Sequence, residues 1–349
     1  MSNGQLSRRS VLKTAIAAAA GAPLIMTSKT KAESRGRIYG KDAHTYEVID
    51  NWAQRPGDKP WGNTHMVQEV ADGRIFIHHT GPQSVHVYDP DGKFIEAWGD
   101  HGGHAHGMDL RKEGNEEFLY FAPTGQSRIV KTNLKGEVAF ECGVPTEAKN
   151  ARGEPCYGEG KGKYIPTFIA FAPGDDGDFY VADGYGSSYI HRYNVKGEYQ
   201  QTFGGKGKAD GQLDCPHGIY CDTRDPADPT ILVADRSNHR LQWFTLDGKH
   251  LKTVTEELRD PCHFDQQGTD ILIPDLNGRV TIFDKDNKLI THLGDNPDPA
   301  KRRNHGVKKE DLTPGDFCTP HGAIWDRAGN IYVAEWLPYG RATKLRRVS

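Results

Sequence analysis

The sequence predicts an all-β protein folded as a six-bladed β-propeller. A cassette of short strands and polar turns returns six times, at intervals of about 40 to 60 residues, and this is the spacing of propeller blades. The chain contains 40 glycines and 20 prolines, which suits a turn-rich β protein. No stretch shows the sustained periodicity of an amphipathic helix.

Each cassette opens with a short strand that carries a landmark residue. A hydrophobic strand ending in Ala-Asp or a variant follows, then an aromatic-containing strand and an Asp-Gly-Lys-like turn. The six landmarks are His65, His106, Thr167, His217, His263 and His321. Equivalent positions of a propeller form a ring around one axis, so five imidazoles are expected to converge on one channel mouth.

The first 32 residues are expected to be a removable export signal. The string Ser7-Arg8-Arg9-Ser10-Val11-Leu12-Lys13 is a twin-arginine signature, an apolar stretch occupies residues 14–26, and Thr30-Lys31-Ala32 is a small-residue cleavage site. The alternative is a membrane anchor, but the apolar stretch is shorter than the ~20 residues that a spanning helix needs. The sequence therefore predicts a periplasmic protein, delivered by the twin-arginine export machinery, whose propeller comprises residues 33–349.

The two ends of the chain are expected to close the ring together. The roughly 317 residues after the signal give about 53 per blade. Residues 45–52 read as a strand ahead of the first landmark, whereas the last repeat stops at Val348-Ser349, short of a full blade. We expect the N-terminal strand to complete the sixth blade, which leaves no open edge.

The net charge restricts the partners expected for this chain. The formal net charge is −3 with both signs interspersed, so neither nucleic acid nor an anionic membrane is favoured, and a small-molecule substrate is expected.

An even number of cysteines in an exported protein permits disulfides, and Cys142 and Cys156 could bridge within one long connection. Cys215, Cys262 and Cys318 lie within three residues of a landmark histidine and could be metal ligands or staple neighbouring blades.

Three of the histidines are expected to bind one metal ion. Blades two, four and six of a six-bladed ring are related by about 120°, so His106, His217 and His321 approach the axis from evenly spaced directions. Three neutral imidazoles with a fourth position open form a catalytic zinc arrangement, and copper or iron is the alternative metal. Each histidine could instead cap a strand end. His65 and His263 fit no threefold set and are expected to be substrate contacts, outer hydrogen-bond donors or ligands of another metal.

The repeat strings resemble those of NHL-repeat proteins, and more narrowly the peptidyl-α-hydroxyglycine α-amidating lyases. The strings that carry the resemblance are Gly177-Asp178-Phe179-Tyr180-Val181-Ala182-Asp183-Gly184-Tyr185 and Val233-Ala234-Asp235-Arg236-Ser237-Asn238-His239-Arg240. The resemblance implies a six-bladed propeller that binds zinc through His106, His217 and His321. It also implies that Tyr185 is the catalytic base and that Arg236 contacts the substrate.

The chain departs from that family at three positions. His79 stands where the family has a second arginine, and it is expected to contact the substrate from that position. An imidazole does not replace a bidentate guanidinium clamp on a substrate carboxylate. Gly322 replaces an aspartate that serves a structural calcium, which makes such a calcium doubtful here. Gly186 replaces a cysteine. We therefore expect the fold and the metal site of the family to apply to this chain more than its substrate does.

Three functions remain open at this point. The first is an exported, metal-dependent lyase or hydrolase of a small oxygenated substrate such as a carbinolamide. The second is a lactonase-like propeller hydrolase, whose calcium site favours Asp, Glu and Asn at the channel. The third is a non-catalytic NHL-repeat scaffold, which gives no reason to gather five histidines on one ring.

Overall fold

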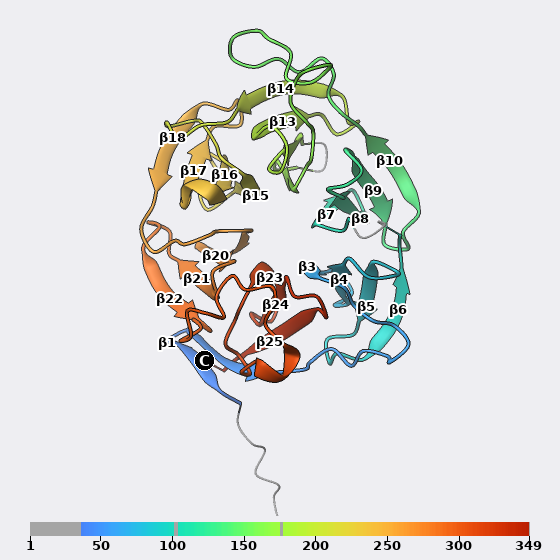
Figure 1. Cartoon of the computed structure of the whole chain (residues 1–349), viewed down its shortest axis with the longest axis vertical. Coiled ribbons are helices and arrows are strands. Elements are labelled where there is room, and N and C mark those ends of the chain that lie inside the picture. Colours follow the sequence, from blue (N-terminus) through green and yellow to red (C-terminus); the bar gives the residue numbers. More distant parts are fainter. Residues whose placement is uncertain (1–35, 101–103, 175–176, 349) are drawn as a thin grey trace, which may run out of the picture. The chain divides into compact units, whose positions relative to one another are not determined.

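The computed structural model describes residues 36–348, except 101–103 and 175–176, so the export signal predicted at residues 1–32 lies outside the described residues. Within the described part, the regular structure is β apart from two short 3-10 turns, η1 (Arg236–Asn238) and η2 (Lys309–Asp311). Six antiparallel sheets surround a central axis (Figure 1). The predicted six-bladed β-propeller is therefore confirmed. No helix in this part of the chain is long and apolar enough to cross a bilayer.

Five blades are four-stranded sheets and blade 6 has five strands, and in each blade the strands run in order from the axis to the rim. Blade 1 consists of β3 (Thr64–Glu69), β4 (Ile75–His79), β5 (Val85–Tyr88) and β6 (Phe94–Trp98). Blade 2 consists of β7 (Gly107–Glu113), β8 (Glu116–Ala122), β9 (Ile129–Asn133) and β10 (Val138–Cys142). Blade 3 consists of β11 (Phe168–Phe171), β12 (Phe179–Ala182), β13 (Tyr189–Tyr193) and β14 (Tyr199–Gly204).

The second half of the ring follows the same plan. Blade 4 consists of β15 (Pro216–Asp222), β16 (Thr230–Asp235), β17 (Arg240–Phe244) and β18 (His250–Val254). Blade 5 consists of β19 (Asp265–Gln267), β20 (Asp270–Asp275), β21 (Arg279–Phe283) and β22 (Leu289–Leu293). Blade 6 contains β23 (Pro320–Trp325), β24 (Ile331–Glu335), β25 (Arg341–Arg347), β2 (His44–Ile49) and β1 (Ile38–Lys41).

Strands from both ends of the described chain close the ring within blade 6. β2 pairs antiparallel with β25, with Tyr46 opposite Arg347 and Val48 opposite Leu345. The indole N–H of Trp325 also donates a 3.0 Å hydrogen bond to the Tyr46 hydroxyl. The predicted completion of the last blade by an N-terminal strand is confirmed, and β1 adds an outermost strand that the sequence did not predict (Figure 1).

The hydrophobic core lies between neighbouring blades, since the middle strands of a blade are buried on both faces. All five residues of β4 and all five of β24 are buried. Phe76, Met108 and Phe121 belong to one fully buried cluster that joins blades 1 and 2. Each of the six landmark residues lies at or just before the start of the innermost strand of its blade. The packed blades thereby fix these residues as a ring around the axis.

Candidate metal centre

Three imidazoles meet on the propeller axis. They are His106 at the start of blade 2, His217 in β15 of blade 4 and His321 in β23 of blade 6. The ring centroids lie 4.7 Å apart in every pair, and each residue is at most 3% exposed. Equal spacing is what three equivalent positions on alternating blades produce. We call these three residues the triad.

A β-bulge turns two members of the triad toward the axis. The pairing of β15 with β16 shifts between Pro216 and Gly218, so His217 has no partner on the neighbouring strand. β23 shows the same shift around His321, and β3 shows it around His65. A bulge inserts one residue and re-aims its side chain, and such bulges are frequent next to functional sites. Here the inserted residue is the histidine.

In each member of the triad, Nδ1 faces a backbone carbonyl of the next blade. The pairs are His106 with Thr167 at 3.0 Å, His217 with Cys262 at 2.9 Å and His321 with His65 at 3.1 Å. A carbonyl oxygen can only accept a hydrogen bond, so Nδ1 carries the proton and Nε2 keeps a free lone pair. This is the tautomer of a histidine that binds a metal through Nε2 while the protein fixes its other nitrogen.

The positions of the Nε2 atoms in the triad favour a bound cation over direct contact between unprotonated nitrogens. Those of His106 and His217 lie 3.1 Å apart, and neither has a proton to share. Burial, together with the charges of neighbouring imidazoles and Arg236, lowers the pKa of all three rings well below the usual value, so protonation does not relieve the contact at neutral pH. Tetrahedral zinc, with Zn–N bonds of ~2.0–2.1 Å, holds its nitrogens about 3.3 Å apart. The donor set therefore suits a metal ion.

The glycine after each histidine is required by the close approach of the next blade. A Cβ atom at Gly107, Gly218 or Gly322 would lie 2.2, 2.3 or 2.5 Å from the very carbonyl oxygen that the preceding histidine contacts. At Gly322 it would also lie 2.3 Å from the Sδ atom of Met66. The close packing of the next blade thus explains the repeated His-Gly pair. Gly322, which corresponds to the calcium-binding aspartate of the family, has no room for a side chain in this chain.

A fourth histidine borders the triad. The His65 ring centroid is 4.6 Å from that of His321 and 5.1 Å from that of His106, and nitrogens of the three residues lie within 4.8 Å of one another. Nδ1 of His65 faces the carbonyl of Asn63 at 3.2 Å, so this residue also presents a bare Nε2. Burial lowers its pKa to about 3. The mouth therefore offers four imidazoles of one tautomer.

Tyr185 and Arg236 lie together beside the triad. The Tyr185 hydroxyl is 3.0 Å from Nε2 of both His106 and His217, although 40% of the residue is exposed. One guanidinium nitrogen of Arg236 is 3.4 Å from that hydroxyl. Burial raises the pKa of Tyr185 to about 12, and the charge of Arg236 opposes the rise. A proton-transfer group and a fixed cation thus share the solvent side of the triad.

Two thiols lie against the Arg236 guanidinium. Its nitrogens are 3.3 Å from the Sγ atom of Cys215 and 4.0 Å from that of Cys262. Burial raises the pKa of both thiols, that of Cys262 to about 12, so both are protonated at neutral pH. All six cysteines lie in the described part and all are free, so the possible bridge between Cys142 and Cys156 is not formed.

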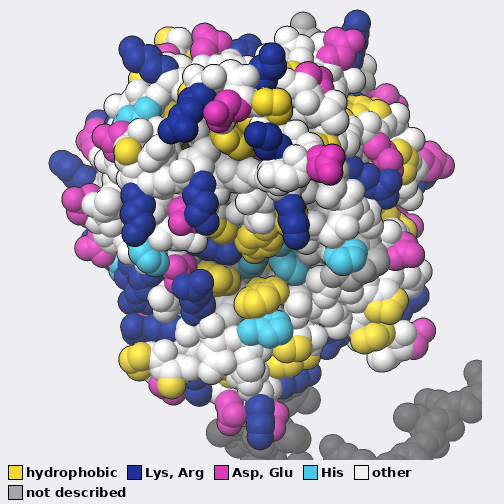
Figure 2. Space-filling view, turned by 45° about the horizontal axis from the view of Figure 1, so that its top comes forward, with side chains coloured by type: hydrophobic (Ala, Val, Ile, Leu, Met, Phe, Trp, Pro, Cys, Tyr) yellow, Lys and Arg dark blue, Asp and Glu magenta, His cyan; other side chains and the backbone are white. Residues whose placement is uncertain are grey.

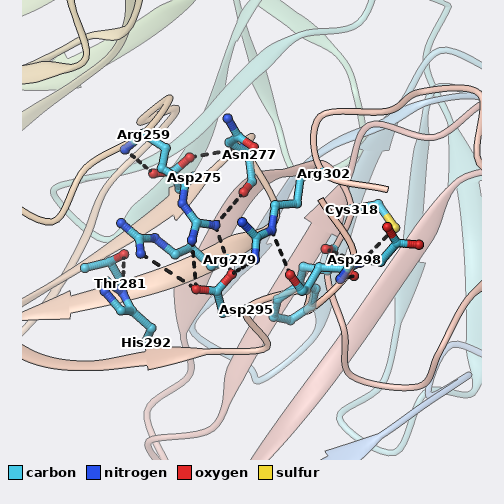
Figure 3. A network of polar contacts seen from close by, with 12 residues as sticks. Arg259, Asp275, Asn277, Arg279, Thr281, His292, Asp295, Asp298, Arg302 and Cys318 are labelled. Carbon is cyan, nitrogen blue, oxygen red and sulfur yellow. Dashed lines mark hydrogen bonds and ion pairs between the residues drawn. The ribbon is translucent and has the colours of Figure 1, made fainter. Parts of the chain in front are cut away.

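The carboxylates that end the second strands hold the segments leading to the landmarks. Asp275 of β20 accepts hydrogen bonds from the backbone N–H groups of Arg259 (2.7 Å) and Asp260 (2.8 Å), and Figure 3 shows that Arg259 also pairs with Asp295. Equivalent bonds join Asp183 to Ile165, Asp235 to Asp214 and Glu335 to Cys318. The Ala-Asp signature, which the sequence analysis used only as a repeat marker, therefore positions the site.

His79 takes the place of that carboxylate in blade 1. It ends β4 as Glu335 ends β24, it is 0% exposed, and its Nδ1 accepts a 3.0 Å hydrogen bond from the N–H of Gly81. Its Nε2 therefore carries the proton, which is the opposite tautomer from the triad. The ring lies 4.4 Å from that of His86. The predicted substrate contact is thus enclosed between blade strands.

The structure places His263 apart from the triad. Its ring lies 4.9 Å from that of Phe168, and burial lowers its pKa to about 3. It lines a cavity of about 310 Å³ together with Asp109 and Asp265, which follow the landmarks along the channel. Of the two histidines that fit no threefold set, only His65 lies at the mouth.

Comparison with known proteins supports the same architecture. No family model matches the chain. Human NHL repeat-containing protein 3 is 22% identical over 246 residues, which cover 66% of this chain and 67% of that protein. The chain is thus a six-bladed propeller that is similar to NHL-repeat proteins. Peptidyl-alpha-hydroxyglycine alpha-amidating lyase 1 of Drosophila melanogaster is 29% identical over 199 residues, 52% of this chain and 35% of that lyase.

Two groups of solved enzyme structures share the fold of this six-bladed propeller. Virginiamycin B lyase from Staphylococcus aureus matches with a TM-score of 0.55 and 14% identity, covering 87% of this chain and 99% of that one. A gluconolactonase from Xanthomonas campestris matches with a TM-score of 0.57 and 15% identity, covering 90% of this chain and 99% of that one. The relatives and the structural neighbours thus include lyases and lactonases.

Proposed function

We propose that this propeller is a zinc-dependent lyase or hydrolase that acts on a small oxygenated substrate at the histidine mouth. The observation that carries the proposal is the convergence of bare Nε2 atoms with the Tyr185 hydroxyl 3.0 Å from two of them. Closed structural zinc sites commonly use cysteine thiolates, whereas neutral imidazoles with an open position are typical of catalytic zinc. The protonated state of the Cys215 and Cys262 thiols fits the catalytic class.

The side chains around the triad support proton transfer. A bound zinc ion would polarise a substrate hydroxyl or carbonyl, or supply hydroxide near neutral pH. Tyr185 is placed to remove the proton of a substrate hydroxyl that occupies the open position. Arg236 is placed to stabilise the phenolate form of Tyr185, which accepts this proton and becomes the neutral phenol, and to bind a substrate oxygen, since its guanidinium is 3.4 Å from the tyrosine hydroxyl. His65 borders the site beside His106 and His321.

The substrate class follows from the same residues. The Drosophila relative is named for peptidyl-α-hydroxyglycine, which carries a carbinolamide and a terminal carboxylate. The carbinolamide matches the metal, Tyr185 and Arg236. The carboxylate lacks its second arginine, because the enclosed, neutral His79 stands there. A carbinolamide or related hydroxylated substrate without an essential carboxylate is therefore the class we propose.

We also propose export to the periplasm, on the basis of the twin-arginine string at residues 7–13. Replacing Arg8 and Arg9 together by lysine should retain the precursor in the cytoplasm, as measured by cell fractionation. Unchanged export of the double variant would contradict the proposal. Figure 2 shows basic and acidic side chains interspersed over one face, which supports a small-molecule partner over a polyanion.

The decisive experiment combines metal analysis with one conservative variant. We expect stoichiometric zinc in the purified protein, with loss of the metal when all three triad histidines are replaced by alanine. Tyr185→Phe should keep the metal and lower turnover of an α-hydroxyglycine-terminated peptide or amide about 10²–10⁴-fold. Copper or iron in place of zinc would redirect the chemistry to redox substrates. Lactone turnover that depends on calcium and survives Tyr185→Phe, or an absence of bound metal, would overturn the proposal.

A further inference from the structure

The part of the channel beyond the triad contains a second polar cavity. It has a volume of about 310 Å³, and its lining includes Gln68, Asp109, Tyr220, His263 and Asp265. Asp109 belongs to β7, three residues beyond His106, and Asp265 opens β19, so both come from innermost strands. A cavity of this volume holds about ten water molecules at ~30 Å³ each. It is therefore large enough for an ion with part of its hydration shell.

Two carboxylates face this cavity without a counter-charge. Neither Asp109 nor Asp265 forms an ion pair with any described residue, and each residue is only partly exposed where it borders the cavity. Oδ1 of Asp109 accepts hydrogen bonds from Gln68 Nε2 at 2.9 Å and from the backbone N–H of Leu110 at 2.8 Å. Oδ2 of Asp265 accepts one from the backbone N–H of Trp325 at 2.6 Å. Buried charges in proteins are normally paired or bound to a metal, so this pair lacks a cation.

The neighbours of the carboxylates point to the same conclusion. His263 lines the cavity and is 3% exposed, and its Nδ1 has no hydrogen-bond partner among the described residues. Tyr220 lies close enough that, after burial, the charges of Asp265 and Asp109 contribute most to raising its pKa. One imidazole nitrogen without a partner, one hydroxyl and two carboxylates thus line one cavity. Burial also raises the pKa of both carboxyl groups to about 7, which a bound cation would reverse.

We propose that this cavity binds one hydrated calcium ion, held by the carboxylates of Asp109 and Asp265. Calcium accepts six to eight oxygen ligands in a flexible geometry and tolerates water among them. The remaining polar groups, Tyr220 and His263, hydrogen-bond the water ligands. The site is separate from the Gly322 position, which has no side chain, and it does not depend on the chemistry proposed for the triad. The channel would then hold a site of imidazole nitrogens at one level and a site of hard carboxylate oxygens at another.

Terbium luminescence tests this site directly. Terbium(III) occupies calcium sites and emits when a nearby aromatic side chain is excited. With full-length protein freed of divalent cations by a chelator, we expect one terbium per chain, displaced by calcium. Asp109→Asn and Asp265→Asn should each weaken terbium and calcium binding at least tenfold. Tyr220→Phe should reduce the sensitised emission while keeping calcium affinity within a few fold.

The controls separate a lost ligand from a lost fold. Asp286→Asn removes the same charge from an exposed position paired with Lys285, and it should bind terbium as the wild type does. Both channel variants keep hydrogen-bond acceptors and lose a buried charge, so their melting temperatures in chelator should equal or exceed that of the wild type. They should also retain the triad's metal. Calcium binding that persists in both channel variants, or no binding of either ion by the wild type, would overturn the proposal.

Discussion

Gly218 lies against the carbonyl oxygen of Cys262 that also fixes Nδ1 of His217. A Cβ atom there would stand 2.3 Å from this oxygen and 2.9 Å from both the carbonyl carbon of Cys262 and Cα of His263, so Gly218→Ala must push the two inner segments apart by about 1 Å to restore ordinary contact. Overpacking of this kind costs about 1–3 kcal/mol of the free energy of unfolding. Loss of an outer hydrogen-bond partner lowers metal affinity about 10–100-fold.

The matched control is Gly143→Ala, because an added Cβ at Gly143 meets no atom within 4 Å. Competition with a chromogenic chelator gives the metal affinity of each variant, and urea denaturation of the metal-free forms gives stability. We expect Gly218→Ala to lower both the metal affinity and the free energy of unfolding, and Gly143→Ala to change neither. Wild-type metal affinity in a destabilised Gly218→Ala protein would show that the carbonyl does not orient His217, and would refute the tautomer argument.

Two further predictions concern buried groups. His79→Arg should lower the free energy of unfolding by about 3 kcal/mol or more, since it buries a charge beside His86 and no carboxylate is paired with residue 79 in the described part of the chain. Urea denaturation should show no such loss for the exposed control His104→Arg. The second concerns pH. Because burial raises the folded-state pKa of Asp109 and Asp265 to about 7 from near 4, the folded protein holds more protons than the unfolded chain between these values. Calcium-free stability should therefore fall across this window as pH rises, and less steeply in Asp265→Asn. Parallel pH profiles for wild type and variant would contradict this.

The repeat pattern was sufficient to predict the architecture. Six landmarks give six blades, and a lone strand ahead of a truncated last repeat gives the closure seen between β2 and β25. The angular positions of equivalent residues in a ring also place His106, His217 and His321 on alternating blades. These conclusions need only spacing, because each blade repeats one local unit and symmetry then fixes where equivalent residues lie.

Only the tertiary structure decided where the individual side chains point. His65 and His263 occupy equivalent landmarks, yet one borders the triad and the other lines the calcium cavity. The sequence predicts that His79 contacts the substrate, but the residue is enclosed, at the position where other blades have a carboxylate at the end of the second strand. The role of the Ala-Asp signature was likewise invisible in sequence.

The physical reason is that local pattern and side-chain direction obey different rules. A bulge at His217 or His321 inserts one residue, and one residue is enough to turn a strand side chain to another face. The tautomer of each triad histidine depends on a carbonyl in the next blade, 45 to 256 residues away in the chain. The sequence determined which residues approach the axis, and contacts between blades determined which of their nitrogens are free to bind a metal.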